Sequence, residues 1–365
     1  MRRFLSSKKS FGFILVALLL VVIFAGCSSN EAQKTDSKTT VSTPALVLHP
    51  PSNSTVAAST EPLGAFSLDE IGATNIVDVA FVESKMGDPG WVIIDGREKK
   101  DYDKGHIPGA VNYPDSIVKT LKHPMDGRVH PAEKVAKLLG EIGVSNDKKV
   151  IVYGTKGDYH VMCEMAPVYY GLQEWDYMNG GYEAWVKAGK KVDTAPVTPT
   201  PATFSPSVKN PNMYVSTPQM AAIVNAKDAN YYLLDNRSKD EFSGKGMAGI
   251  RAGRIPGAVN FPPDVNLDSD TKAMLSVEKL GEVYKEVPKD KTVILYCHRG
   301  CRTSFTFMAL RALGYKDIRV YEDGFVVWNM WLELPVDEEH FLNFRGDLKT
   351  TVEKVKAMET PPASK

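Results

Sequence analysis

The chain has 365 residues, which is long enough for two or three domains, and 43% of them are apolar, as in ordinary globular proteins. Lys and Arg total 44 and Asp and Glu also total 44, so no charge imbalance favours nucleic acid or an acidic partner. The four cysteines stand at positions 27, 163, 297 and 301, too few and too scattered for a disulfide framework. Because no Cys/His spacing typical of a metal site occurs either, we expect no metal and no organic cofactor.

Residues 1–27 are typical of a targeting segment. A basic start precedes a nearly unbroken apolar run over 11–25, which is short for a membrane span. The run ends in Phe24-Ala25-Gly26-Cys27, which resembles the lipobox of bacterial lipoproteins. That resemblance implies a signal peptide, lipidation of Cys27, and a mature protein anchored to a bacterial membrane outside the cytoplasm. An uncleaved anchor is the alternative, and it would place the body on the same side.

The rest of the chain divides by composition. Residues 28–63 are rich in Ser, Thr, Ala and Pro and are typical of a flexible tether. We expect a first globular unit over 64–195, a proline-rich linker over 196–211 and a second unit over 212–340. Residues 341–365 form a charged tail.

The first unit begins with a short helix capped by Ser67. Apolar runs over 91–95 and 149–153 predict buried strands, and the pattern over 131–139 predicts a helix. A further helix is expected from just after Asp158 through Tyr170. The YMNGGYEAW segment at 177–185 then predicts a Gly-Gly turn that leads into another helix.

The second unit repeats the first. YYLLDNR at 231–237 matches WVIIDGR at 91–97, and GRIPGAVNFP at 253–262 matches GHIPGAVNYP at 105–114. TVILYC at 292–297 matches KVIVYG at 149–154 in the same order along the chain. Strands that alternate with helical runs predict an α/β domain with a mostly parallel sheet and helices on both faces, present in two tandem copies.

The stretch 291–314, KTVILYCHRGCRTSFTFMALRALG, carries the candidate chemistry. Cys297 follows directly on a predicted strand, a loop runs to Arg302, and helical spacing begins at Thr303 with Gly314 as its stop. Ligands of open α/β sheets bind at such strand ends. The helix start, Arg299 and Arg302 all favour the thiolate form of Cys297, whereas a small buried cysteine is the alternative without function.

CHRGCR, preceded by VILY and followed by an amphipathic helix, resembles the active-site loop of rhodanese-type sulfurtransferases, and the D-x-R and [HR]-I-P-G-A elements fit the same family. The resemblance implies that Cys297 carries sulfane sulfur as a persulfide held by loop amides. It implies a small sulfur-containing anion such as thiosulfate as donor, and cyanide, a thiol or a protein as acceptor. Gly154 stands where the second unit has Cys297, so the first unit is expected to be a non-catalytic half.

Other residues each have two interpretations. Asp235 and Arg237 orient the loop or contact substrate, although Asp95 and Arg97 in the first unit favour a structural pair. Arg254 adds positive charge near the pocket or faces solvent, and His298 acts as a base or faces solvent. The expected substrate-binding group comprises His298, Arg299, Gly300, Cys301, Arg302 and Arg254.

Two thiols remain to be placed. Cys301 either resolves the persulfide by forming a disulfide with Cys297 or is a neutral small residue, and the neutral interpretation is favoured. Cys163 is expected to be a buried structural thiol.

Three functions compete. The first is a sulfurtransferase that works through a Cys297 persulfide in two half-reactions. The second is phosphatase or arsenate-reductase chemistry, whose related loops have seven residues where this chain has six from Cys297 to Arg302. The third is an extracytoplasmic persulfide carrier or thiol-redox sensor that uses Cys297 and Cys301 with little turnover.

Overall fold

The computed structural model describes residues 60–113, 129–246 and 250–341. The predicted signal peptide, Cys27, residues 28–59 of the predicted tether and residues 342–365 of the tail lie outside these ranges, and the side chain of Cys163 is likewise outside the described part. Among the helices within these ranges, none has the length and apolar character needed to cross a membrane.

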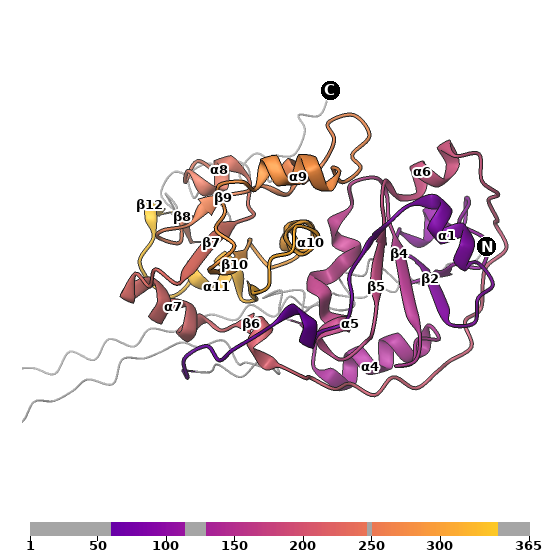
Figure 1. The fold of residues 1–365 in the computed structure, drawn as a ribbon, viewed down its shortest axis with the longest axis horizontal. Coiled ribbons are helices and arrows are strands. Elements are labelled where there is room, and N and C mark those ends of the chain that lie inside the picture. Colours follow the sequence, from indigo (N-terminus) through magenta and orange to yellow (C-terminus); the bar gives the residue numbers. More distant parts are fainter. Residues whose placement is uncertain (1–59, 114–128, 247–249, 342–365) are drawn as a thin grey trace, which may run out of the picture. The chain divides into compact units, whose positions relative to one another are not determined.

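The first repeat forms a five-stranded parallel sheet with the order β1-β5-β4-β2-β3. Its strands are β1 (Ile76–Val77), β2 (Trp91–Asp95), β3 (Val111–Asn112), β4 (Lys149–Tyr153) and β5 (Trp175–Met178). Its helices are η1 (Leu68–Glu70), α1 (Val79–Lys85), α2 (Lys99–Tyr102), α4 (Ala132–Glu141), η2 (Tyr159–Met165), α5 (Ala166–Tyr169) and α6 (Gly181–Lys187) (Figure 1). The central strands β2 and β4 are the apolar runs that the sequence predicts.

The second repeat has the same topology, with a parallel sheet in the order β6-β11-β10-β7-β9. Its strands are β6 (Tyr214–Val215), β7 (Tyr231–Asp235), β9 (Val259–Asn260), β10 (Thr292–Tyr296) and β11 (Ile318–Tyr321). Its helices are η3 (Pro211–Met213), α7 (Thr217–Ala226), α8 (Lys239–Phe242), η4 (Pro263–Asn266), α9 (Val277–Val283), α10 (Thr303–Ala312) and α11 (Gly324–Trp328). The expected α/β fold in two tandem copies is therefore confirmed.

Helices cover both faces of each sheet because the strands bury apolar side chains on both sides. In the first repeat, α1 and α6 pack on one face through Val82 and Trp185. In the second, α7 and α11 pack on one face through Met220 and Trp328. The opposite faces of the two sheets share one continuous apolar core, which includes Leu139 of α4 and Phe305 of α10.

Contacts between the repeats place segments of the first beside the helix that follows the cysteine loop. Tyr177 of β5 lies 5.1 Å from Phe305 of α10 between ring centroids. Asn179 joins the repeats through two hydrogen bonds, since its side chain accepts from the N–H of Met274 at 2.7 Å and donates to the carbonyl of Met274 at 3.2 Å. Arg311 of α10 donates to the carbonyl of Gly72 at 2.8 Å.

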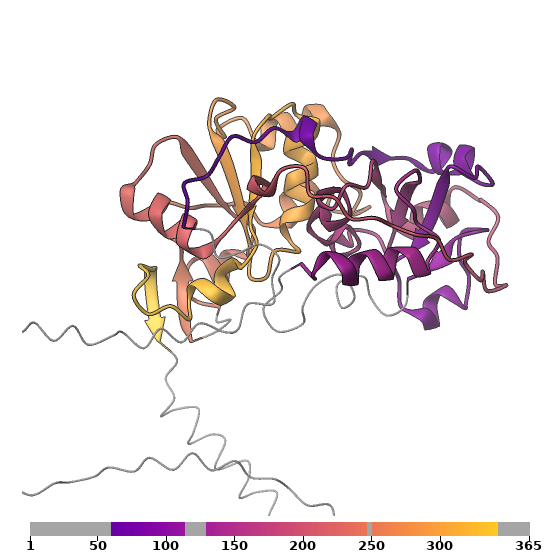
Figure 2. The same ribbon diagram turned by 90° about the horizontal axis from the view of Figure 1, so that it is seen from below.

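Two features differ from the sequence prediction. The helix expected from just after Asp158 through Tyr170 is a 3-10 helix, η2, followed by the short α5. The break falls at Met165, whose φ is +62°, just before Pro167, which has no N–H to donate. A two-stranded antiparallel sheet also pairs β8 (Arg251–Arg254) with β12 (Asp337–Phe341), which Figure 2 shows in yellow. The first repeat has a shorter counterpart, a single antiparallel bridge between Asp193 and His106, the residue aligned with Arg254.

Candidate active site

The candidate site begins where β10 ends. Cys297 follows Tyr296 directly and is 1% exposed, and β10 lies between β7 and β11 in the middle of its sheet. Parallel pairing of Tyr296 with Asp235 brings the end of β7 to the same edge. Cys297 therefore lies at the carboxyl edge of a central strand, where parallel α/β sheets bind ligands.

The carbonyl groups of the loop that starts at Cys297 are held by the helices on either side. The N–H groups of Phe325 and Val326 in α11 donate to the carbonyls of Cys297 and His298 at 2.8 and 3.0 Å.

On the other side, the N–H groups of Thr303 and Ser304 in α10 donate to the carbonyls of Gly300 and Cys301 at 3.0 and 3.3 Å. Because the C=O and N–H of one peptide unit point in opposite directions, the N–H groups that follow these four carbonyls point away from α10 and α11. These N–H groups are backbone donors of the kind that binds an anion when several of them converge.

Two glycines make this loop conformation accessible. Gly300 has a φ of +88°, in the left-handed region that other residues rarely adopt. Gly324, the first residue of α11, has a φ of +62°, and a Cβ atom built on it would lie 2.6 Å from the carbonyl oxygen of His298. The approach of α11 to the loop therefore requires glycine at 324.

Arg302 closes the loop and forms an ion pair with Glu241 of α8. Its Nη1 and Nη2 donate to the two carboxylate oxygens at 2.5 and 2.9 Å. Burial opposes ionisation of Glu241, but the hydrogen bonds and the charge of Arg302 outweigh it and lower the pKa of that carboxyl to about 2. Burial also opposes the charge on Arg302, yet the bond to Glu241 and the nearby Cys297 thiolate raise its pKa.

His298 is neutral at physiological pH. Burial, followed by the positive charges of Arg299 and Arg302, lowers the pKa of its imidazole to about 4. Its Nδ1 atom is buried with no hydrogen-bond partner in the structure. A neutral imidazole next to Cys297 in the chain can accept or donate a proton. The side chain of Arg299, the next residue, is exposed.

Asp235 and Arg237 form a buried ion pair whose Nη2–Oδ2 distance is 2.6 Å. Arg237 also donates to the carbonyl of Gly253 at 2.8 Å and lies 3.9 Å from the centroid of the Phe325 ring. The first repeat builds the same arrangement from Asp95 and Arg97, with an Nη2–Oδ2 distance of 2.6 Å. These contacts join the end of β7 to α11, the helix that binds the loop carbonyls, and both side chains are buried.

Arg254 lies on β8 and contacts residues of α8 and β12. Its guanidinium lies 4.6 Å from the centroid of the Phe242 ring and donates to the carbonyl of Phe242 at 3.3 Å. Arg254 also forms an ion pair with Glu338 of β12, with an Nη2–Oε1 distance of 3.9 Å. The structure thus places Arg254 at the β8–β12 sheet, while it brings Cys297, His298, Gly300, Cys301 and Arg302 together with the exposed Arg299 in one loop.

A cavity of about 510 Å³ opens beside Arg302, and one of its walls comes from the first repeat. That wall is Tyr159, whose ring lies edge-on to Phe305 with a centroid distance of 6.0 Å. The other lining residues are Ser238, Lys239, Pro262, Pro263, Asp264 and Val265. Sequence reasoning missed Tyr159 and also missed Glu241, for which the capping pattern S-x-x-E at 238–241 was the available signal.

Tyr159 lies close to the reactive groups of the loop. Burial raises the pKa of its hydroxyl to about 12, with smaller effects from Arg302, Cys297 and Cys301. The first repeat therefore places a hydroxyl beside the candidate site of the second repeat.

The equivalent loop of the first repeat has the same frame without the thiol. The N–H of Tyr182 donates to the carbonyl of Gly154 at 2.9 Å, as that of Phe325 does to Cys297. A Cβ atom built on Gly154 would lie 2.7 Å from Cγ1 of Val161 and 2.9 Å from Oδ2 of Asp158. This loop therefore has neither the nucleophile nor the space for one.

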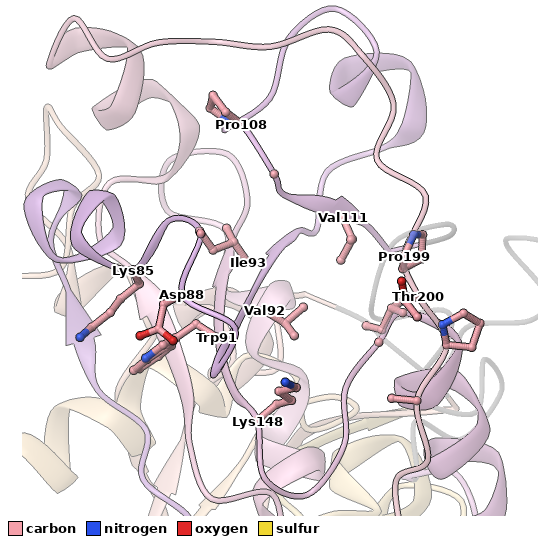
Figure 3. Close-up of a pocket in the computed structure, with 16 residues that line it drawn as sticks. Lys85, Asp88, Trp91, Val92, Ile93, Pro108, Val111, Lys148, Pro199 and Thr200 are labelled. Atoms are coloured by element: carbon pink, nitrogen blue, oxygen red, sulfur yellow. The ribbon is translucent and has the colours of Figure 1, made fainter.

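A second cavity, of about 500 Å³, lies on the first repeat and is shown in Figure 3. Trp91, Val92 and Val111 line it, together with Pro199 and Thr200 of the linker (Figure 3). None of its lining residues belongs to the cysteine loop. In the described part of the chain, no group of three or more His, Cys, Asp or Glu side chains is arranged to hold a metal ion.

Comparison with known proteins extends this picture. The chain is 25% identical over 273 residues to a thiosulfate sulfurtransferase of Pseudomonas aeruginosa, covering 72% of this chain and 96% of the relative. It is 27% identical over 277 residues to the sulfur carrier protein TtuD of Thermus thermophilus, covering 72% and 95%. The anaerobic ergothioneine biosynthesis enzyme of Chlorobium limicola has a similar fold, with a TM-score of 0.64 at 20% identity, over 72% of this chain and 69% of that one.

The profile of the rhodanese-like domain matches residues 78–188 and again residues 216–330, which together make up more than half of the chain. Each match covers four of the five strands of one parallel sheet, and the second contains the loop that begins at Cys297. The relatives named for sulfur transfer support that activity for the family as a whole. The chain therefore belongs to the rhodanese family, as a protein with two tandem rhodanese-like domains.

Proposed function

We propose that this protein is a sulfurtransferase that moves sulfane sulfur from thiosulfate, or a similar anionic donor, to a thiophilic acceptor through a persulfide on Cys297. One observation carries the proposal. Cys297 directly follows a central strand and begins a loop whose carbonyls accept hydrogen bonds from α10 and α11, so the N–H groups of these peptide units point away from the helix that each carbonyl contacts. Such donors stabilise a thiolate and, after sulfur transfer, the anion of a persulfide.

The two half-reactions follow from this arrangement. The Cys297 thiolate attacks the outer sulfur of thiosulfate, the S–S bond breaks, and sulfite leaves with the electron pair. The acceptor, cyanide or a thiolate, then attacks the terminal sulfur and restores the thiolate of Cys297. Arg302 interacts electrostatically with Cys297 and lines the cavity, which favours the approach of an anion.

The test is release of sulfite and formation of thiocyanate by the full-length protein purified in detergent. We expect about one equivalent of sulfite when thiosulfate is added without an acceptor, and continuous thiocyanate formation when cyanide is present. Cys297→Ser should abolish both, whereas Cys163→Ser serves as the matched thiol control and should retain both. Sulfite release that is unchanged in Cys297→Ser would refute the proposal.

A carrier function is the second candidate, and the relative named as a sulfur carrier protein favours it. A carrier would release sulfite once per molecule and pass its sulfur to a partner protein, with little turnover on free acceptors. The rate of thiocyanate formation at steady state distinguishes the two functions, because a catalyst turns over many times and a carrier does not.

The location is a separate proposal that rests on the sequence around Cys27. We propose that the protein is a lipoprotein anchored to a bacterial membrane outside the cytoplasm. Metabolic labelling with palmitate should label the wild-type protein and not Cys27→Ser, and the variant should lose its membrane association. Equal labelling of the two proteins would contradict the proposal.

A further inference from the structure

The active-site loop contains a second thiol. Cys301 follows Cys297 by four residues and is 8% exposed, and the structure holds both residues as thiols. Ser304 holds the carbonyl of Cys301 twice, through its N–H at 3.3 Å and its hydroxyl at 3.0 Å. The sequence alone leaves the role of this thiol open.

The first repeat shows how the two positions are oriented. Its loop has the same length and the same left-handed glycine, since Gly157 has a φ of +74° where Gly300 has +88°. In that loop a Cβ atom built on Gly154, the counterpart of Cys297, would lie 3.1 Å from the Cβ of Asp158, the counterpart of Cys301. In the first repeat, the first and fifth positions of this loop therefore lie next to each other.

That separation is shorter than the distance of about 3.5–4.5 Å between the Cβ atoms of bonded cysteines, so a small widening of this frame gives the distance that a disulfide requires. Both thiols also interact electrostatically with the hydroxyl of Tyr159, which lines the cavity beside Arg302. Cys297 and Cys301 thus both lie near Tyr159, on the side of the loop where Arg302 lines the cavity.

We propose that Cys301 is a resolving thiol, which converts the Cys297 persulfide into a Cys297–Cys301 disulfide and releases hydrosulfide. This inference rests on the proposed function, because it needs the persulfide as its starting point. It gives the protein a further activity, the reduction of sulfane sulfur to sulfide, in which a dithiol supplies the electrons.

The step balances in atoms and charge. The sulfur of Cys301 attacks Sγ of Cys297, the bond between Sγ and the sulfane sulfur breaks, and the electron pair leaves with the sulfane sulfur. That sulfur takes the proton of the Cys301 thiol and departs as HS⁻. The two cysteines are oxidised by two electrons and the sulfane sulfur is reduced by two, after which an external dithiol reduces the disulfide by exchange.

The experiment uses the full-length protein in detergent, with thiosulfate added and no acceptor present. Sulfite, sulfide and intact mass are followed for the wild type, Cys301→Ser and Cys301→Ala, the last as a second variant in case serine disturbs the loop. The wild type should release sulfite, then about one equivalent of sulfide, and lose two hydrogens in mass. Dithiothreitol should restore the thiols and allow a second round.

In both variants, the sulfur whose loading is recorded by sulfite release should stay on the protein as one added sulfur atom. Their sulfide release should be at least about tenfold slower, because an intramolecular thiol has a very high effective concentration. The wild-type rate should not depend on protein concentration. A wild type that keeps its added sulfur as long as the variants do would overturn the inference and leave the proposed function intact. Failure of every form to release sulfite would instead overturn the proposed function itself.

Discussion

Substitution of Gly324 by alanine tests whether α11 sets the geometry of the active-site loop. The residue has a φ of +62°, and its new methyl group would lie 2.6 Å from the carbonyl oxygen of His298 and 2.9 Å from that of Cys297. Left-handed backbone costs an alanine about 1–2 kcal/mol. Displacement of the loop weakens two hydrogen bonds, from Phe325 and Val326, at about 1 kcal/mol each.

The expected loss of stability is therefore about 3–4 kcal/mol. The activity should fall further than the stability alone explains, because a shift of about 1 Å at a reacting atom can reduce the rate about a hundredfold. We expect kcat/KM for thiosulfate and cyanide to fall about a hundredfold in Gly324→Ala under conditions where the variant is folded by circular dichroism.

Gly181→Ala is the matched control. Gly181 also has a φ of +62°, and its methyl group would lie 2.6 Å from the carbonyl carbon of Thr155 in the non-catalytic loop. Urea unfolding should show a similar destabilisation for both variants, whereas only Gly324→Ala should lose activity. If both variants are equally destabilised and Gly324→Ala keeps kcat/KM within about twofold of the control, the argument that α11 positions the loop is wrong.

Three further predictions concern charge and space in the two loops. Glu241→Gln should lower the free energy of unfolding by about 3 kcal/mol at pH 7, because the pKa of this carboxyl is about 2 in the folded protein and 4.5 for an unperturbed glutamate. This stabilisation is present above pH 4.5 and is lost as the pH falls toward 2. The free energies of unfolding of the two proteins, measured by chemical denaturation, should therefore converge near pH 2. A difference between them that stays constant with pH would contradict the role of the ion pair with Arg302. The pH–rate profile should show no limb from His298 near its ordinary value of 6.5, since its pKa is about 4, and a limb near 6.5 that disappears in His298→Gln would refute that assignment. Gly154→Cys should acquire no reactive thiol in the first repeat, because Val161 occupies the space, and sulfur transfer from thiosulfate to position 154 of this variant at the rate of Cys297 would show otherwise.

The sequence predicts the repeated α/β architecture because its information is local and occurs twice. The runs at 91–95, 149–153, 231–235 and 292–296 are apolar and β-rich, and each forms a central strand of a parallel sheet. The break at Met165 was not predicted, because the pattern of apolar residues after Asp158 continues through it. Backbone conformation at one residue, before Pro167, decides where that helix begins.

The site divides in the same way. Sequence reasoning placed a cysteine at the end of a central strand and identified the loop around it. For Arg254 it left two positions open, near the pocket or facing solvent, and in the structure that side chain contacts Phe242 and Glu338. Arg254 lies on β8, which pairs with β12 more than 80 residues further along the chain, and residue spacing does not predict a pairing over that distance.

By itself, the sequence determined the duplication, the parallel sheets and the position of the cysteine loop after a central strand, because these follow from residue type and spacing within short segments. Only the tertiary structure decided which distant residues complete the site. Glu241 pairs with Arg302, which lies 61 residues further along the chain. The N–H groups of α11 bind the loop carbonyls, and Tyr159 of the first repeat lines the cavity beside Arg302. Such contacts depend on how helices and sheets pack, and no local periodicity encodes a partner that lies on another element.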